Sequence, residues 1–152
     1  MTDSVDFAIL KRRLEAFPDS DLGKGATDAD IREAEVALGA SLRGGYRAFL
    51  RSFGWGGTGD IELFGLGADV PQHLNVVTVT TSERREAQPP LPSHLIPVMN
   101  DGGGNLYCID VSEAYRDECP IVFWDHEAGP NQDPEQVSDS FTVWLSQRLD
   151  DQ

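Results

Sequence analysis

The side chains that could carry acid–base, nucleophilic or metal chemistry are few in this chain. His73, His94 and His126 stand apart from one another, and Cys108 and Cys119 lack the paired spacing of a zinc site. No serine lies in a nucleophile elbow. Cys108 and His126 could still converge in space, although a cysteine in a buried strand more often packs as a small apolar side chain. We therefore expect no catalytic residue, no metal and no cofactor, and a protein that is not an enzyme.

The triplet Asp125-His126-Glu127 superficially resembles a metal or acid–base cluster. It follows the apolar run Ile121 to Trp124, which predicts a strand. Adjacent residues on an extended chain point to opposite faces, so the three side chains are not expected to converge. Asp125 and Glu127 are instead expected to contribute negative charge to a surface.

Three consecutive glycines between Asp101 and Asn105 form the most distinctive motif of the chain. They separate two apolar runs, residues 96–98 and 106–111. Because glycine reaches positive φ without steric cost, two strands can reverse tightly here. A cation or phosphate site is the alternative, but the motif lacks the alternating carboxylates of a calcium loop and no helix follows it. We expect a hairpin with Asp101 at the rim of a sheet, within reach of a partner.

Net charge is the second informative feature, since 12 basic and 26 acidic side chains give −14. Residues 101–152 hold 12 of the acidic side chains and only 2 of the basic ones. Such a surface repels nucleic-acid phosphates and anionic lipid, and it speeds encounter with a basic protein. The sequence therefore predicts a basic protein partner, with no direct nucleic-acid or membrane binding, although acidity can also serve solubility alone. The acidic candidates for this contact, beyond Asp101, are Asp125, Glu127, Asp133 and Glu135.

Trp55 lies in the glycine-rich loop 54–59. A large aromatic side chain presented by a loop is a typical interface anchor, which makes Trp55 a candidate partner-binding residue. The alternative is a tryptophan folded back as a lid over the core, and both interpretations stay open. Trp124 falls in a predicted strand and Trp144 on the apolar stripe of a predicted helix, so both are expected in the core.

Helices and short strands are predicted in an order typical of an α+β fold. Four segments have apolar residues at helical spacing, namely 5–17, 28–38 between a Thr27 cap and a Gly39 stop, 46–53, and a C-terminal helix capped by Ser138. Short apolar runs predict strands at 61–64, 96–98, 106–111 and 121–124. Helices near both ends thus flank a small, mostly antiparallel sheet.

Residues 71–87 are ambiguous, because Val76 to Thr81 has strand propensity and Ser82 to Ala87 has helix propensity. A rigid, proline-rich linker follows at 88–92. The length of 152 residues favours one domain over residues 1–152. We expect a cytoplasmic protein with reduced thiols, because there is no secretion signal, no long apolar span and no disulfide framework.

The order of elements, together with several short motifs, resembles the SUKH superfamily over about residues 25–146. In the first half the resemblance rests on Ile31 to Gly39, Leu42, Tyr46, Phe49, Leu50, Gly56-Gly57 and Leu63-Phe64. In the second half it rests on Ile96-Pro97, Asp101 to Gly104, Tyr107 to Asp110 and Pro120 to Glu127. Two positions depart from the family pattern: Arg43 stands where proline is common, and Trp55 where asparagine often precedes the glycine pair.

The SUKH superfamily includes bacterial immunity proteins against polymorphic toxins and a fungal regulator of cell-wall glucan synthesis. The resemblance implies a helix within 71–87 and a binding protein without catalysis. It favours an immunity protein that neutralises a toxin domain by occlusion, and a nuclease toxin would suit the acidic surface. The alternative is a regulatory scaffold of the cell-wall type.

Overall fold

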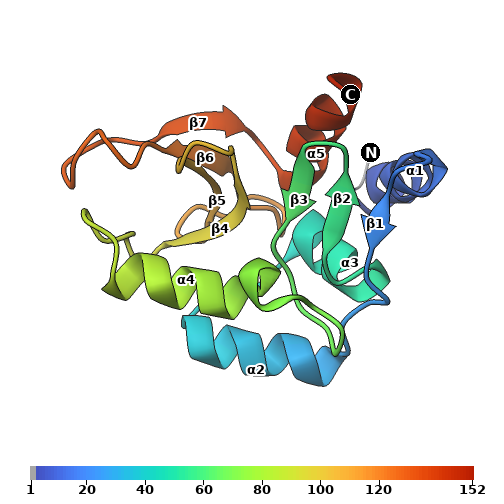
Figure 1. The fold of residues 1–152 in the computed structure, drawn as a ribbon, viewed down its shortest axis with the longest axis horizontal. Helices are drawn as coiled ribbons and strands as arrows, with labels where there is room; N and C mark the ends of the chain where they lie inside the picture. The colour runs from blue at the N-terminus through green and yellow to red at the C-terminus, as the bar shows by residue number, and fades with distance from the viewer. Residues whose placement is uncertain (1–2) are drawn as a thin grey trace.

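The structure, a computed structural model, describes residues 3–152 and the side chains of residues 7–152. It contains helices and two antiparallel sheets (Figure 1). The helices are α1 Asp3–Ala16, α2 Asp28–Leu38, α3 Gly44–Ser52, α4 Val76–Arg85, α5 Phe141–Asp150 and a 3₁₀ turn, η1, at Gln72–Leu74. The strands are β1 Asp21–Leu22, β2 Gly56–Thr58, β3 Ile61–Leu63, β4 Leu95–Asn100, β5 Leu106–Asp110, β6 Ile121–Trp124 and β7 Glu135–Ser138. This confirms the α+β class.

The strands form two sheets rather than the single sheet expected from the sequence. One sheet has the order β1-β2-β3 and the other β4-β5-β6-β7, with antiparallel neighbours throughout. A backbone hydrogen bond of 2.8 Å from Phe64 N to Val98 O links the two sheets just after β3. The four-stranded sheet contains the Asp101 hairpin between β4 and β5 and the acidic loop between β6 and β7.

The extra sheet includes β2, which the sequence analysis placed in a loop. Its glycines are required by close backbone approach: a Cβ at Gly56 would collide with Asp21 O, and one at Gly57 would collide with Ile61 O. Gly56 also has φ of 115°, which side chains rarely adopt. Pairing on both sides, rather than strand propensity, therefore makes this segment a strand.

The first three predicted helices are confirmed as α1, α2 and α3. For α2, Thr27 accepts from Asp30 N while the Asp30 carboxylate accepts from Thr27 N, and Gly39 ends the helix with φ of 71°. The apolar stripe of α3 is buried, including Tyr46 and Phe49 at 0% exposure. Amphipathic spacing therefore predicted these elements correctly.

The ambiguous segment 71–87 contains η1 and α4, so the helix implied by the family resemblance is correct. Asn75 caps α4, because its side-chain oxygen accepts from Val77 N at 2.9 Å and Thr78 N at 3.2 Å. Near its other end, Arg84 donates to Leu38 O at 2.9 Å and to Ser93 O at 2.8 Å. Cap and tertiary contacts thus outweigh the β-branched composition.

Two predictions near the C-terminus are wrong. No strand was predicted between residue 124 and the last helix, but Glu135–Ser138 form β7, which pairs with β6. The helix cap is Ser140 rather than Ser138, since Ser140 Oγ accepts from Val143 N at 3.2 Å. Ser138 ends β7, and its hydroxyl donates to Ser140 O.

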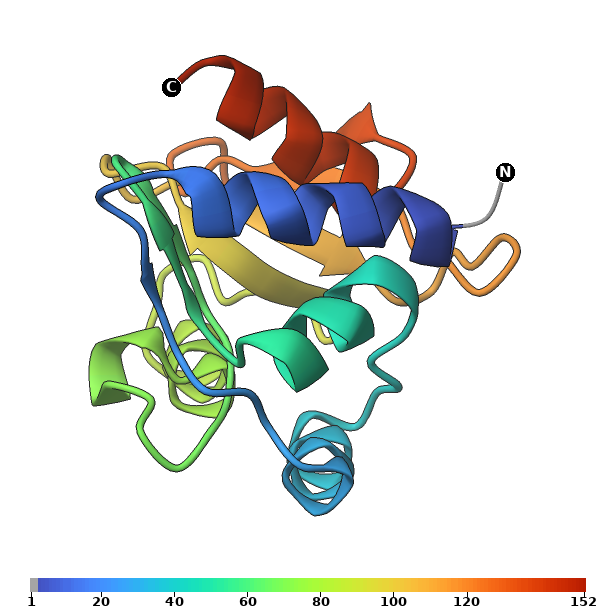
Figure 2. The same cartoon turned by 90° about the vertical axis from the view of Figure 1, so that its right-hand side faces the viewer.

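The apolar side chains form one core cluster that spans both sheets and all five helices. Figure 2 shows α1 lying beside α5, with α3 below them, and these three helices contact one another. Phe141 and Trp144 of α5 pack against Tyr46 and Tyr107 respectively. Trp124 and Trp144 are both 2% exposed, as predicted.

Candidate partner-binding surface

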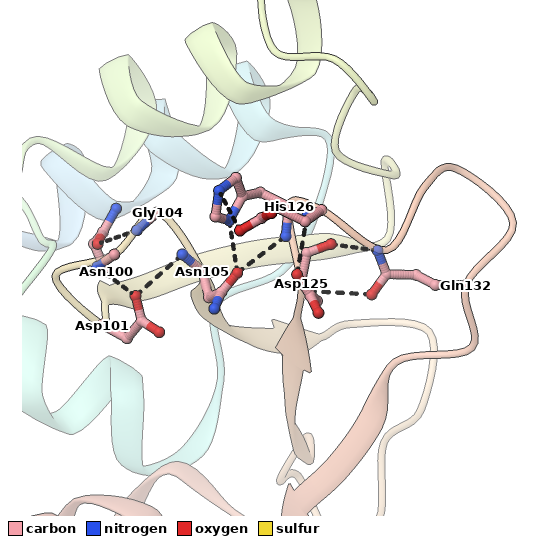
Figure 3. Close-up of polar contacts among 9 residues, drawn as sticks. Asn100, Asp101, Gly104, Asn105, Asp125, His126 and Gln132 are labelled. Atoms are coloured by element: carbon pink, nitrogen blue, oxygen red, sulfur yellow. Dashed lines mark hydrogen bonds and ion pairs between the residues drawn. The ribbon is translucent and has the colours of Figure 1, made fainter.

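The β4–β5 turn is held by its own side chains (Figure 3). Asn100 Oδ1 accepts from Gly102 N at 2.7 Å and Gly104 N at 3.3 Å. Asp101 Oδ1 accepts from Gly103 N at 2.8 Å and Asn105 N at 3.1 Å. Gly102 and Gly104 have φ of 94° and 101°, as the glycine motif predicted. Because the turn's N–H groups bond these side chains, they do not form a cradle for a phosphate.

Asn105 connects this turn to the loop that follows β6. Its side-chain oxygen accepts from His126 N at 3.1 Å and lies 2.6 Å from His126 Nδ1. Since that oxygen can only accept, Nδ1 carries the proton in this contact. The imidazole also lies against Gly104, where an added Cβ would come within 2.9 Å of the ring. The two segments, far apart in sequence, therefore form one structure.

Gln132 closes the β6–β7 loop in the same way. Its side-chain oxygen accepts from Asp125 N at 3.1 Å, and its amide nitrogen donates to Asp125 O at 2.7 Å and Gly129 O at 3.1 Å. Asp125 Oδ1 in turn accepts from Glu127 N at 2.9 Å. The loop backbone is thus fixed by short hydrogen bonds inside the loop itself (Figure 3).

These contacts correct one argument from the sequence. His126 and Glu127 lie in a turn rather than on an extended strand, and His126 Nε2 is 3.7 Å from Glu127 Oε1. Alternation between two faces therefore does not separate their side chains. Asp125, however, bonds the backbone, and no group of three His, Cys, Asp or Glu side chains that could hold a metal ion exists among residues 3–152.

We define the acidic edge as Asp101, Asp125, Glu127, Asp133 and Glu135, the predicted carboxylates on these two segments. Four of them are exposed, and Asp125 is half-buried. The Asn105–His126 contact brings Asp101 next to the start of the loop, while Gln132 holds Asp133 close to Asp125. Glu135 lies opposite Phe123 at the start of β7. The segments 101–105 and 125–135 contain no lysine or arginine, so the edge is negative throughout.

Glu83 of α4 lies near this edge. Burial raises the pKa of its carboxyl group, and the neighbouring His126 opposes that rise. A half-buried carboxyl group beside an imidazole was not apparent from the sequence, because 43 positions separate the two residues.

Trp55 does not join the acidic edge. Its side chain is 9% exposed, and its Nε1 donates to Asp69 Oδ1 at 3.1 Å. The ring fills the space beside Gly23, where a Cβ would collide with the indole. Trp55 therefore occupies the lid position that the sequence also allowed, and a role in partner binding stays a prediction that this position does not favour.

The two thiols are poor nucleophiles. Cys108 is fully buried and Cys119 is 7% exposed, and both are free. Burial raises the pKa of both thiols, and well above the usual value for Cys108. His126 is engaged with Asn105, so Cys108 and His126 do not form a nucleophile–base pair in this structure.

The chain is similar to known proteins over nearly its whole length. The SUKH_5 family model, described as SMI1-KNR4 cell-wall, matches residues 10–150. The chain belongs to the SUKH superfamily. The match begins earlier than the resemblance at 25–146 and includes the second half of α1. The SPbeta prophage-derived uncharacterized protein YokK of Bacillus subtilis (strain 168) is 26% identical, over 97% of this chain and 88% of that protein.

Membership bears on the kind of function, because SUKH proteins are immunity or regulatory proteins rather than known enzymes. The relative in Bacillus subtilis is uncharacterized and adds no activity of its own. Within residues 3–152, every helix is too short or too polar to cross a membrane.

Proposed function

We propose that this SUKH protein is an immunity protein that binds a basic toxin domain through the acidic edge and occludes it. The observation that carries the proposal is a set of exposed carboxylates on two loops that hydrogen bonds hold together. A preformed backbone loses little conformational entropy on binding, which favours tight association. A negative surface also steers a basic partner toward it.

A nuclease is the toxin class that fits this surface best. A nuclease groove attracts phosphates through lysine and arginine, and the same groove attracts a row of carboxylates. Glu127, Asp133 and Glu135 are exposed on the acidic edge, and no hydrogen bond of their side chains holds the loops. They are therefore available to contact a basic groove without disturbing the loops.

A regulatory scaffold is the second candidate, because the matching family model carries the cell-wall description. In that case the acidic edge would bind a cellular protein rather than a toxin. The similar Bacillus subtilis protein is prophage-derived, and this origin fits the immunity role better than the scaffold role.

The test uses the toxin domain encoded beside this gene, expressed in a sensitive host with and without the protein. We expect growth to be rescued by the wild type and lost with the triple variant Glu127→Lys/Asp133→Lys/Glu135→Lys. The matched control is Glu33→Lys/Asp60→Lys/Glu62→Lys, which changes net charge equally at exposed positions outside the two loops. Affinity of the purified pair, measured by calorimetry, should fall at least tenfold for the first variant only.

Equal affinity for both variants would show that the acidic edge is not the contact surface. If neither the wild type nor the control variant rescued growth, the immunity role would be rejected and the scaffold favoured. The absence of a toxin gene beside this one would lead to the same conclusion.

A further inference from the structure

The β5–β6 loop, residues 111–120, contains a tight turn with unusual backbone angles. Tyr115 N donates to Glu118 O at 2.7 Å, and Glu118 N donates to Tyr115 O at 2.9 Å. Between them, Arg116 and Asp117 have φ of 51° and 65°. The left-handed region is sterically unfavourable for residues other than glycine. The turn therefore carries two side chains at positions where glycine would be more stable.

The base of this turn is fixed to α3. Glu118 is 7% exposed, and its carboxylate accepts from Gly45 N at 2.8 Å. A Cβ at Gly44 would collide with the same carboxylate. Arg43, at the cap position of α3, makes no side-chain cap bond, so Glu118 supplies the negative group at this helix start. Figure 2 shows the orange loop beside the beginning of α3.

A concavity of about 510 Å³ lies between this turn, the end of β7 and the start of α5. We call it the Tyr115 pocket; its lining includes Glu113, Tyr115, Arg116, Gln136, Asp139 and Val143. Tyr115 is 74% exposed and Val143 is 42% exposed. The described side chains include four large exposed hydrophobic groups, and two of them line this pocket. Exposed apolar groups around a concavity mark a binding site more often than scattered ones do.

The charges around the pocket indicate what it would hold. Glu113 and Asp139 are exposed carboxylates of its lining, against the single cation Arg116. Arg116 Cζ lies 5.3 Å from the centroid of the Tyr115 ring, so this ring already stacks with a guanidinium group of its own chain. Arginine suits such a site better than lysine, because its planar group stacks on a ring and bonds carboxylates in a fork.

We propose that the Tyr115 pocket takes an arginine side chain of a protein partner, stacked on Tyr115 in place of Arg116 and facing the carboxylates of Glu113 and Asp139. The identity of that partner, a toxin domain, rests on the proposed function, but the chemistry of the pocket does not. β5 separates the pocket from the Asp101 turn, since its five residues span about 17 Å. A partner that contacts both ends would run along the four-stranded sheet.

The test needs no toxin. Backbone amide NMR spectra of the full chain are recorded during titration with N-acetylarginine amide, with the uncharged N-acetylcitrulline amide as the control probe. We expect saturable shifts at Tyr115, Gln136 and Val143 with a dissociation constant in the millimolar range, and none with the citrulline probe. Tyr115→Phe should bind as the wild type does, Tyr115→Ala about threefold more weakly, and Glu113→Gln/Asp139→Asn more weakly still.

Three outcomes would overturn the proposal: no saturable shift, equal shifts with citrulline or lysine amide, or unchanged binding by Tyr115→Ala. All the substituted side chains are exposed, so these variants should keep the wild-type fold. The triple variant of the acidic edge should still bind arginine amide. A failed growth rescue together with intact arginine binding would reject the immunity role but not the arginine site. Growth rescue without arginine binding would reject the arginine site but not the immunity role.

Discussion

Asn105 is the residue on which the geometry of the acidic edge depends most directly, because one oxygen accepts from two groups of His126. Asn105→Ala leaves both donors without that acceptor in a half-buried place. We expect the free energy of unfolding to fall by about 1–2 kcal/mol, measured by urea denaturation. The matched control is Asn131→Ala, at an exposed position of the β6–β7 loop, which should change stability by less than about 0.5 kcal/mol. Equal effects of the two changes would contradict the role given to Asn105.

Glu83 gives a pH-dependent prediction. Burial raises its pKa in the folded state above the ordinary glutamate value of about 4.3. The folded state thus favours the protonated form, and this contribution to stability is lost as pH rises through the folded pKa. At pH 7 the ionised group therefore lowers stability.

We expect Glu83→Gln to stabilise the protein at pH 7, by less than about 1 kcal/mol because the group is partly exposed. The gain should shrink as pH falls toward 5, as measured by urea denaturation at both pH values. Glu86→Gln, an exposed neighbour, should show no such trend. A gain for Glu83→Gln that does not change with pH would contradict burial as the cause.

At the scale of elements, the start of α3 depends on a residue from a distant loop. Glu118→Ala removes the carboxylate that Gly45 N bonds, and we expect a loss of about 1–3 kcal/mol in the free energy of unfolding. Glu118→Gln keeps an acceptor and should lose less. Glu113→Ala, in the same loop but exposed, serves as the control. If Glu113→Ala were equally harmful, the loop as a whole and not the helix start would be responsible.

The elements that could be predicted from the sequence are those whose own residues carry an apolar pattern. The stripe of Tyr46, Phe49 and Leu50 predicted α3, and the runs at β4, β5 and β6 predicted strands. β1 and β2 have two and three residues with no such pattern, and pairing alone makes them strands. β7 is polar and exposed at Glu135 and Gln136, so its sequence looks like a loop.

The charges of the candidate surface were predictable from the sequence, but the hydrogen bonds that hold its two loops were not. Composition pointed to the carboxylates, whereas Asn105 and Gln132 are single polar residues without a periodic signal. Asn100 could have been identified from the sequence, because it directly precedes Asp101 and the three glycines. Asparagine side chains often accept from the backbone N–H two residues later. The contact of Asn105 with His126 depends on which strands are neighbours, and local sequence does not specify that.

At the scale of the whole molecule, the net charge is −14. We therefore expect added salt to stabilise the folded protein but to slow its association with a basic partner. Salt screens repulsion among the carboxylates, so sodium chloride up to 0.5 M should raise the thermal midpoint of the free protein. The same screening should lower the association rate with a basic partner at least tenfold. Calorimetry and stopped-flow mixing measure the two effects. If salt raised the thermal midpoint without lowering the association rate, long-range charge would not drive association.

The hydrogen bonds of the acidic edge have a consequence for how such a protein can diverge. Asn100, Asp101, Asn105 and Gln132 hold the loop backbones, whereas Glu127, Asp133 and Glu135 are exposed and none of these three makes a side-chain hydrogen bond that holds the loops. The outer residues can therefore be exchanged one at a time without loss of the framework beneath them. A lineage that faces a changing opponent could alter its specificity by single substitutions and keep the same fold.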